Sequence, residues 1–271
     1  MIQRTISTGQ MEAVFFCDEG GTPSRTIVLL AGSGGGLFSA RPYEIVPDKL
    51  VSKGYSVLDL AYFRWGRLPR RARRIPLEYF EHALSWLSDQ PEVIPGQYAL
   101  LGRSQGGQLA LVLASRYPEC RAVVAVVPSH VVFQGMGMPY LAGSWWTHGG
   151  TDLPFVPFAP VPWLLTGGLG ALTGHLGYLY RASLRRSGRS GEAAIPVELI
   201  HGPVQLISAT KDQIWPSEAM CEAIMSRLFA HKFPHHHEHV AIEGPHWPLA
   251  KRESWQAIYR FLGDHFPPYA S

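Results

Sequence analysis

Short apolar runs alternate with longer amphipathic stretches along most of the chain. The apolar runs predict β-strands at residues 12–17, 26–31, 55–60, 98–101, 121–127, 204–208 and 239–242. The amphipathic stretches predict helices at residues 43–52, 76–88, 217–229 and 253–265, and a further apolar helix begins after Ser104. A run as continuously apolar as 26–31 is typical of a strand covered on both faces. The pattern therefore predicts an α/β fold with a mostly parallel, doubly wound sheet.

This alternation stops between Pro128 and Ala194. Residues 128–194 are rich in aromatic residues, proline and glycine. We interpret them as a cap inserted into a single domain of residues 1–271, lying over the carboxyl ends of the strands, where open α/β sheets bind ligands. The apolar composition favours a pocket for an acyl group or another hydrophobic substrate, although core packing would explain the same residues without a ligand. The candidate apolar substrate contacts are Trp145, Trp146 and, beyond the insertion, Trp215.

One part of the insertion has the length of a membrane span. Residues 153–180 contain no Asp, Glu, Lys or Arg. They also contain four prolines and five glycines. Because these residues interrupt helices, we expect a cap here and no transmembrane segment.

The overall composition is ordinary for one large α/β domain with an insertion. The 271 residues are 46% hydrophobic and 17% charged, and the net charge of +3 is too small to indicate a nucleic-acid partner. The three cysteines, Cys17, Cys120 and Cys221, lie far apart, which favours a reducing compartment, the cytoplasm. The first ten residues lack the apolar core of a secretory signal, so we expect none.

The turn Gly102-Arg103-Ser104-Gln105-Gly106 joins an apolar strand to an apolar helix. This Gly-x-Ser-x-Gly pattern is typical of a sharp turn that exposes a nucleophilic serine above the edge of a sheet. Side chains at the two glycines would collide with the neighbouring strand and helix. Gln105 follows the serine, so its backbone N–H lies at a helix N-terminus and points toward an oxyanion. An ordinary strand-to-helix connection is the alternative, but the apolar context favours Ser104 as a nucleophile.

A serine nucleophile needs a general base and an acid that orients the base. Asp212 follows the strand after the insertion, and His246 follows the last strand. This is the order serine, acid, histidine that is expected with such a turn, and it brings three loops to one edge of the sheet. Taken separately, Asp212 could be a turn or capping residue and His246 an incidental histidine. Their joint agreement in order and context favours a catalytic triad.

A glycine-rich loop, residues 31–36, follows the second strand. It lacks the lysine of a phosphate-binding P-loop and the spacing of a dinucleotide-binding motif. In a serine hydrolase such a loop supplies the second oxyanion N–H, here from Ser33 or Gly34. A flexible turn is the alternative.

Residues 64–74 contain six arginines. A solvated surface is one explanation. The other is a contact for an anionic group such as the phosphates of coenzyme A, because arginine binds phosphate through paired hydrogen bonds. Arg64 and Arg67 are the candidates for this contact.

The histidines at positions 235, 236, 237 and 239 are the remaining candidate for chemistry. Zinc ligands converge from one helix face or from paired loops, and consecutive histidines in a loop do this poorly. We interpret them as solvated and predict neither a metal nor a cofactor.

The sequence resembles the acyl-CoA thioesterase and bile acid-CoA:amino acid N-acyltransferase family, in its catalytic α/β-hydrolase domain, which is related to dienelactone hydrolases. The resemblance extends from about Val28 to His246. Its more specific pieces are Leu77-Glu78-Tyr79-Phe80 and Asp212-Gln213-Ile214-Trp215-Pro216-Ser217. The other matching pieces are the glycine-rich loop, residues 54–63, 68–69 and 195–198, the serine turn, and Gly244-Pro245-His246.

The resemblance implies an α/β-hydrolase fold in which Ser104 is the nucleophile, Asp212 the orienting acid and His246 the general base. It also implies cleavage of an acyl thioester. The family's usual amino-terminal β-sandwich domain does not fit before Val28. The nucleophile is serine, whereas the amino-acid-conjugating members use cysteine, and this favours water over an amine as the acceptor.

We therefore expect an enzyme that hydrolyses a small-molecule acyl thioester through an acyl-serine intermediate. A carboxylesterase or lactone hydrolase is the alternative, as is an acyltransferase to an amine or alcohol. A ligand-binding protein without turnover usually lacks a triad residue, and none is lost here.

Overall fold

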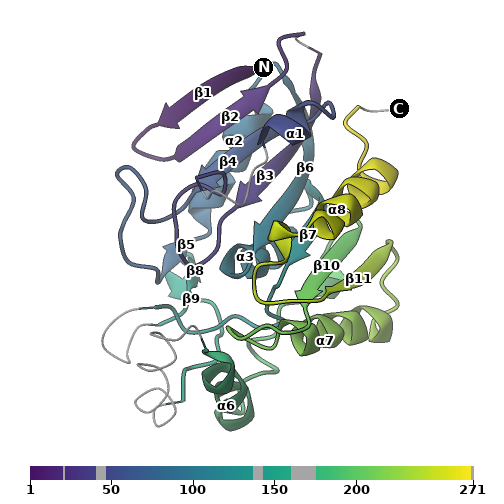
Figure 1. Cartoon of the computed structure of the whole chain (residues 1–271). Helices are drawn as coiled ribbons and strands as arrows, with labels where there is room; N and C mark the ends of the chain where they lie inside the picture. The colour runs from purple at the N-terminus through teal and green to yellow at the C-terminus, as the bar shows by residue number, and fades with distance from the viewer. Residues whose placement is uncertain (21, 41–46, 137–142, 160–174, 270–271) are drawn as a thin grey trace.

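The central sheet organises the molecule (Figure 1). The computed structural model describes residues 1–20, 22–40, 47–136, 143–159 and 175–269. Within these ranges, eight strands pair in the order β1-β2-β4-β3-β6-β7-β10-β11. Their bounds are β1 Ile2–Ser7, β2 Glu12–Cys17, β3 Ser24–Leu30, β4 Ser56–Ala61, β6 Val93–Arg103, β7 Cys120–Val126, β10 Val204–Ala209 and β11 His237–Ile242. In this order, the six strands β4, β3, β6, β7, β10 and β11 pair in parallel, and β1 and β2 add an antiparallel edge. This confirms the predicted mostly parallel sheet.

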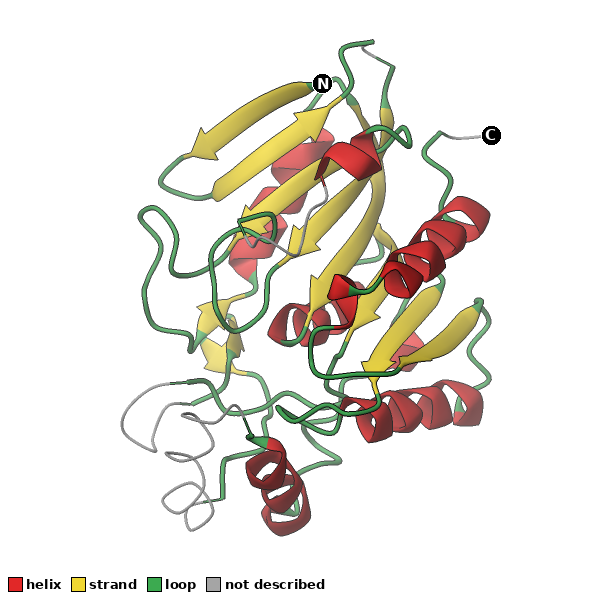
Figure 2. Cartoon of the chain, in the orientation of Figure 1, coloured by secondary structure: helices red, strands yellow, loops and turns green. Residues whose placement is uncertain are grey.

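Helices cover both faces of this sheet (Figure 2). They are α1 Pro47–Val51, α2 Glu78–Ser88, α3 Gln105–Ala114, α7 Ser217–Ala230 and α8 Arg252–His265. Successive side chains of a strand point to opposite faces. In β3, Val28 and Leu30 join a hydrophobic cluster with α2, α3 and α7, whereas Ile27 and Leu29 join a second cluster with α1 and α8. Burial on both faces explains why the central strands are continuously apolar.

Several elements were not predicted from the sequence. The edge strand β1 is polar and largely exposed, so its pattern gave little signal. Within residues 128–194, β8 (Trp146–His148) and β9 (Thr151–Asp152) form a small sheet with β5 (Ile75–Pro76), and α6 spans Gly177–Ser187. The helix predicted over residues 43–52 is described only from Pro47 onward, because residues 41–46 lie outside the described ranges.

The described residues include no helix that is long and apolar enough to cross a membrane. Of the apolar segment 153–180, residues 160–174 lie outside the described ranges.

The parallel strands determine where the predicted site residues lie. The strands β3, β6, β10 and β11 run in the same direction, so their carboxyl ends share one edge of the sheet. The glycine-rich loop, Ser104, Asp212 and His246 each follow one of these four strands. All the predicted catalytic residues are thus brought to this edge.

Candidate active site

Ser104 occupies a strained turn between β6 and α3. Its φ of 57° and ψ of −117° lie in a region that residues with a side chain rarely adopt. A Cβ at Gly102 would lie 2.0 Å from the carbonyl oxygen of Gly106, and a Cβ at Gly106 would lie 2.1 Å from that of Leu30. Glycine is therefore required at both positions, which is the steric reason for the Gly-x-Ser-x-Gly pattern.

The side chains of Ser104, His246 and Asp212 form one hydrogen-bonded series. His246 Nε2 lies 2.9 Å from Ser104 Oγ. His246 Nδ1 lies 2.8 Å from both carboxylate oxygens of Asp212. The histidine and aspartate side chains are only 3% and 2% exposed. A carboxylate only accepts hydrogen bonds, so Nδ1 donates to Asp212 and Nε2 is left to accept the serine proton.

Backbone and aromatic contacts hold the side chains of Asp212 and His246 in place. Asp212 Oδ1 accepts the N–H groups of Ile214, at 2.9 Å, and Trp215, at 3.3 Å. The His246 ring makes edge-on contacts with Trp215 and Trp247, with ring centroids 5.9 and 5.6 Å apart. The Trp215 indole in turn donates to the carbonyl oxygen of Val127 at 3.0 Å. The imidazole is therefore held in its orientation from both sides.

A cavity of about 270 Å³ opens beside Ser104. It is lined by Ser33, Gly34, Arg103, Ser104, Gln105, Met136, Trp145, Leu176, Tyr180, Ile214, Trp215, His246 and Trp247. Most of this lining is apolar, and Ser104 and His246 contribute polar groups to it. Burial, and next the Asp212 charge, raise the pKa of Tyr180, so its phenol stays neutral at physiological pH. Such a cavity suits an uncharged, apolar group next to a polar reacting centre.

The predicted oxyanion donors all line this cavity. Gln105 begins α3, and N–H groups of the first helical turn have no acceptor within their own helix. Ser33 and Gly34 belong to the turn after β3, which is closed by a 3.0 Å bond from the Gly35 N–H to the Gly32 carbonyl. Buried Asp59 anchors the chain beyond this turn by accepting the N–H groups of Phe38 and Ser39 at 2.7 and 2.8 Å.

The structure places only some of the predicted substrate contacts at the cavity beside Ser104. Trp145 and Trp215 line the cavity beside Ser104, but Trp146 does not, and it is fully buried. The Trp146 indole donates to Gln108 at 2.9 Å, which is a core contact. Arg64 lines a separate cavity, and Arg67 lines neither of these two.

Sequence reasoning missed several residues that line the cavity beside Ser104. Tyr180 comes from α6, and Trp247 directly follows His246 in the sequence. The proximity of Trp247 to His246 in the sequence could have indicated its position. Nothing in the sequence pattern indicates Tyr180, because its position depends on how α6 packs.

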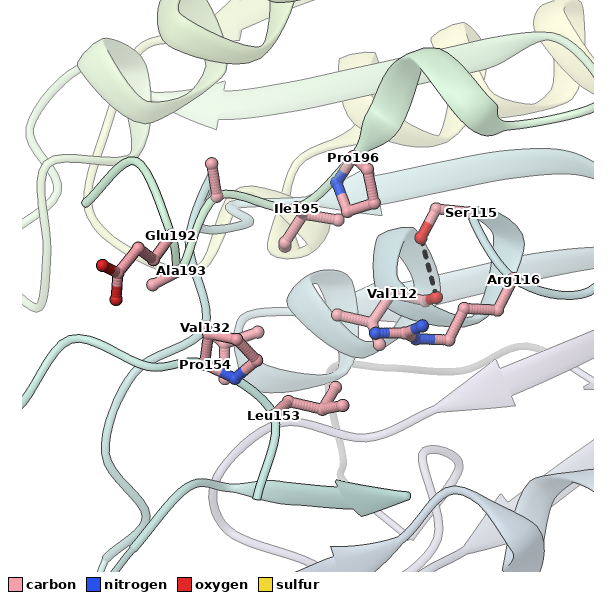
Figure 3. A pocket seen from close by; sticks show the side chains of 11 residues that line it. Val112, Ser115, Arg116, Val132, Leu153, Pro154, Glu192, Ala193, Ile195 and Pro196 are labelled. Atoms are coloured by element: carbon pink, nitrogen blue, oxygen red, sulfur yellow. Dashed lines mark hydrogen bonds between the residues drawn. The ribbon is translucent and has the colours of Figure 1, made fainter. Parts of the chain in front are cut away.

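A second cavity, of about 180 Å³, lies beside the C-terminal half of α3 (Figure 3). Val112, Ser115 and Arg116 contribute to it from the helix and the residues just after it, facing Leu153 and Ile195. The Ser115 hydroxyl donates to the Val112 carbonyl at 2.9 Å. No residue predicted from the sequence as a site residue lines this cavity.

The histidine-rich segment begins just before the edge strand β11 and continues into it. His237 and His239 belong to this strand, and His239 Nε2 lies 2.8 Å from Ser208 Oγ. His236 stacks on His265, with ring centroids 3.9 Å apart. In the described part of the chain, no group of three or more His, Cys, Asp or Glu residues is arranged to hold a metal ion.

Residues 75–261 match the family model described as BAAT / acyl-CoA thioester hydrolase C terminal. The chain belongs to this hydrolase family. Human acyl-coenzyme A thioesterase 6 is 30% identical over 236 residues, which are 83% of this chain and 49% of that protein. The chain spans about half or less of the length of the curated relatives it matches. The resemblance inferred from the sequence motifs is thereby confirmed.

Solved structures confirm the α/β-hydrolase fold. An esterase from Pyrococcus furiosus matches with a TM-score of 0.62 at 17% identity, over 97% of this chain and 90% of that one. A putative dienelactone hydrolase from Klebsiella pneumoniae matches with a TM-score of 0.58 at 14% identity, over 93% of this chain and 91% of that one. At these identities the likeness concerns the fold alone.

Proposed function

We propose that the chain hydrolyses acyl thioesters of coenzyme A through a covalent acyl-Ser104 intermediate. The observation that carries this proposal is the series Asp212–His246–Ser104, with 2.8 and 2.9 Å between successive polar atoms. Membership of the acyl-CoA thioester hydrolase family supports the thioester as the bond that is cleaved.

In the first half of the reaction, His246 Nε2 takes the proton of Ser104 Oγ as the oxygen attacks the thioester carbonyl carbon. The backbone N–H of Gln105 and that of Ser33 or Gly34 donate to the resulting oxyanion. The carbon–sulfur bond then breaks, and the leaving sulfur takes the proton from His246, which returns the imidazole to its neutral form. The products are a free thiol and acyl-Ser104.

In the second half, His246 removes a proton from a water molecule that attacks the acyl-Ser104 carbonyl. The ester bond to Oγ breaks, Ser104 regains its proton from His246, and a carboxylic acid leaves. Asp212 remains a carboxylate and stabilises the imidazolium that forms in each half. Because both side chains are buried, this electrostatic stabilisation is only weakly screened by solvent.

The region from 128 to 194 acts in this proposal as the cap over the acyl group. Trp145, Leu176 and Tyr180 from this region line the cavity beside Ser104. Tyr180 packs edge-on against Phe133 and Trp215, with ring centroids 4.9 and 5.3 Å apart. The apolar wall excludes water from the acyl chain and leaves the carbonyl group at the polar end of the cavity.

Comparing matched thioester and ester substrates tests the proposal. A panel of acyl-CoA substrates is followed by thiol release and compared with nitrophenyl esters of the same acyl groups, using Ser104→Ala as the control. We expect a higher kcat/KM for the thioesters and loss of both activities in the variant. Turnover of esters alone would exclude the thioester assignment and favour a carboxylesterase, and a product joined to an added amine or alcohol would favour an acyltransferase.

A further inference from the structure

A third cavity, lined partly by arginines, lies beside the glycine-rich loop, at the carboxyl end of β4. It has a volume of about 440 Å³ and is lined by Arg64, Trp65, Gly66, Leu68 and Arg70. We call residues 64–70 the arginine loop. None of these five lining residues contributes to the cavity beside Ser104.

Hydrogen bonds give the arginine loop a fixed shape. The Arg64 N–H donates to the Pro69 carbonyl at 2.9 Å, and the Leu68 N–H donates to the Trp65 carbonyl at 2.9 Å. The Arg64 Nε donates to the Arg70 carbonyl at 3.2 Å. Arg64 has a φ of 52°, in the left-handed region that is costly for a residue with a side chain. Such strain persists only where surrounding contacts hold the backbone, and it concentrates at functional sites.

The guanidinium groups of Arg64 and Arg70 are available to an anion. Arg74, further along the chain, is paired with Asp152. By contrast, Arg64 and Arg70 are exposed, and neither forms an ion pair with an acidic residue in the part of the chain that the structure describes. Two guanidinium groups without a carboxylate partner that line one cavity are suited to bind phosphate.

Trp65 adds a flat apolar surface to the same cavity. Trp65 is 39% exposed, although tryptophan is usually well buried. Its ring also lies against the glycine-rich loop, because a Cβ at Gly36 would lie 3.3 Å from it. An exposed indole among arginines offers a stacking surface for a nucleobase, and this favours a nucleotide over free phosphate.

The glycine-rich loop connects this cavity to Ser104. A Cβ at Gly32 would lie 3.3 Å from the Cβ of Ser104, and a Cβ at Gly35 would lie 2.9 Å from that of Arg64. The three residue steps between these two glycines span at most about 11 Å. Both cavities are therefore within reach of one elongated ligand.

We propose that the arginine loop binds the nucleotide end of coenzyme A. Arg64 and Arg70 contact its phosphates, Trp65 stacks on its adenine, and the pantetheine arm extends past the glycine-rich loop toward Ser104. This assignment rests on the thioester hydrolysis proposed above, and it adds the site that distinguishes coenzyme A from a shorter thiol.

Calorimetric titration with coenzyme A, which needs no turnover, tests the assignment directly. We expect Arg70→Gln and Trp65→Ala each to weaken binding about tenfold, and Arg64→Gln/Arg70→Gln about a hundredfold. The matched control is Arg121→Gln, an exposed arginine at the amino-terminal end of β7, which should bind like the wild type. Because the Arg64 side chain holds the loop through the Arg70 backbone carbonyl, Arg70→Gln removes a charge and leaves that hydrogen bond in place. Melting curves report the folding of every variant. Equal binding by the wild type and the folded Arg70→Gln variant would overturn the assignment.

Competition distinguishes a nucleotide from phosphate alone. Adenosine 3′,5′-bisphosphate should compete with coenzyme A, whereas inorganic phosphate at the same concentration should not. Equal competition by the two would overturn the coenzyme A assignment.

Kinetics separate this assignment from the proposed function. For one acyl group, we compare kcat/KM for the coenzyme A thioester with kcat/KM for the N-acetylcysteamine thioester, which lacks the nucleotide. The ratio should fall about tenfold in Arg70→Gln and stay constant in Arg121→Gln; a constant ratio in Arg70→Gln would contradict the assignment while leaving thioester hydrolysis supported. If the wild type hydrolyses neither thioester, the proposed function is contradicted, and the titration with coenzyme A still decides the binding site.

Discussion

Replacing Asp212 by asparagine should nearly abolish turnover while leaving the fold intact. In the wild type, Oδ1 accepts two backbone N–H groups, and both carboxylate oxygens lie 2.8 Å from His246 Nδ1. In the variant, the two backbone donors will hold the new amide oxygen in the place of Oδ1, so the amide NH₂ group takes the place of Oδ2. This group donates to Nδ1 and thereby moves the imidazole proton to Nε2, which can then no longer accept the proton of Ser104.

The expected loss is large because the site is buried. The variant lacks the correct tautomer and the negative charge beside an imidazolium whose side chain is only 3% exposed. A loss of about 10³- to 10⁴-fold in kcat is expected for this change in a serine triad, equivalent to about 4 to 5 kcal/mol in the activation free energy. The KM should change little, because Asp212 does not line the cavity.

Steady-state kinetics with the best acyl-CoA substrate measure this effect, and melting curves verify that the variant folds. Asp264→Asn, an exposed aspartate in α8, is the matched control and should retain full activity. A kcat within tenfold of the wild type in folded Asp212→Asn would refute the role given to this carboxylate.

Three further predictions concern the serine turn, the glycine-rich loop and the buried His130. Gly106→Ala places a Cβ 2.1 Å from the Leu30 carbonyl oxygen and should lower the free energy of unfolding by about 3 kcal/mol in denaturant titrations, whereas Gly263→Ala, with open space around it, should not. Asp59→Asn loses an acceptor for the Phe38 or Ser39 N–H, so the glycine-rich loop shifts and kcat should fall about tenfold or more with a smaller change in KM. Burial lowers the pKa of His130 from 6.5 to about 4, so the unfolded chain binds more protons than the folded chain between these pH values. The contribution of neutral His130 to the free energy of unfolding is fully present above pH 6.5 and is lost as the pH falls toward 4. At pH 5 the loss is up to about 2 kcal/mol, and His130→Gln should remove this pH dependence.

Each of these predictions has a contradicting result. Equal stability of the Gly106→Ala and Gly263→Ala variants would show that the close approach of the turn to β3 is not required. An unchanged kcat in Asp59→Asn would show that this carboxylate is not needed to position the glycine-rich loop for catalysis. The same fall in unfolding free energy between pH 7 and pH 5 in His130→Gln and the wild type would exclude His130 as its source.

The features predicted best from the sequence are those that depend on local steric contacts and on the order of strands along the chain. Gly102 and Gly106 are required by contacts within one strand–turn–helix unit and its neighbouring strand, so the serine turn is recognisable without a structure. Asp212 and His246 follow buried parallel strands, and parallel strands bring their carboxyl ends to one edge. This is why the sequence identifies three residues that the fold brings within hydrogen-bonding distance.

Contacts that depend on the packing of short elements could not be predicted. Trp145 and Trp146 are neighbours in sequence, but only Trp145 lines the cavity, because pairing of β8 with β5 fixes which way each side chain points. Arg74 is likewise neutralised by Asp152 in β9, whereas Arg64 is not. No periodic pattern in residues 64–74 or 128–194 encodes these pairings.

Trapping the acyl-enzyme tests the central claim most directly. Mixing the protein with an acyl-CoA substrate, quenching within one turnover and mapping the peptides by mass spectrometry should locate the acyl group on Ser104, with none on the Ser104→Ala variant. Substrate turnover with no acyl group on Ser104 at any time, together with unchanged turnover by Ser104→Ala, would contradict the account.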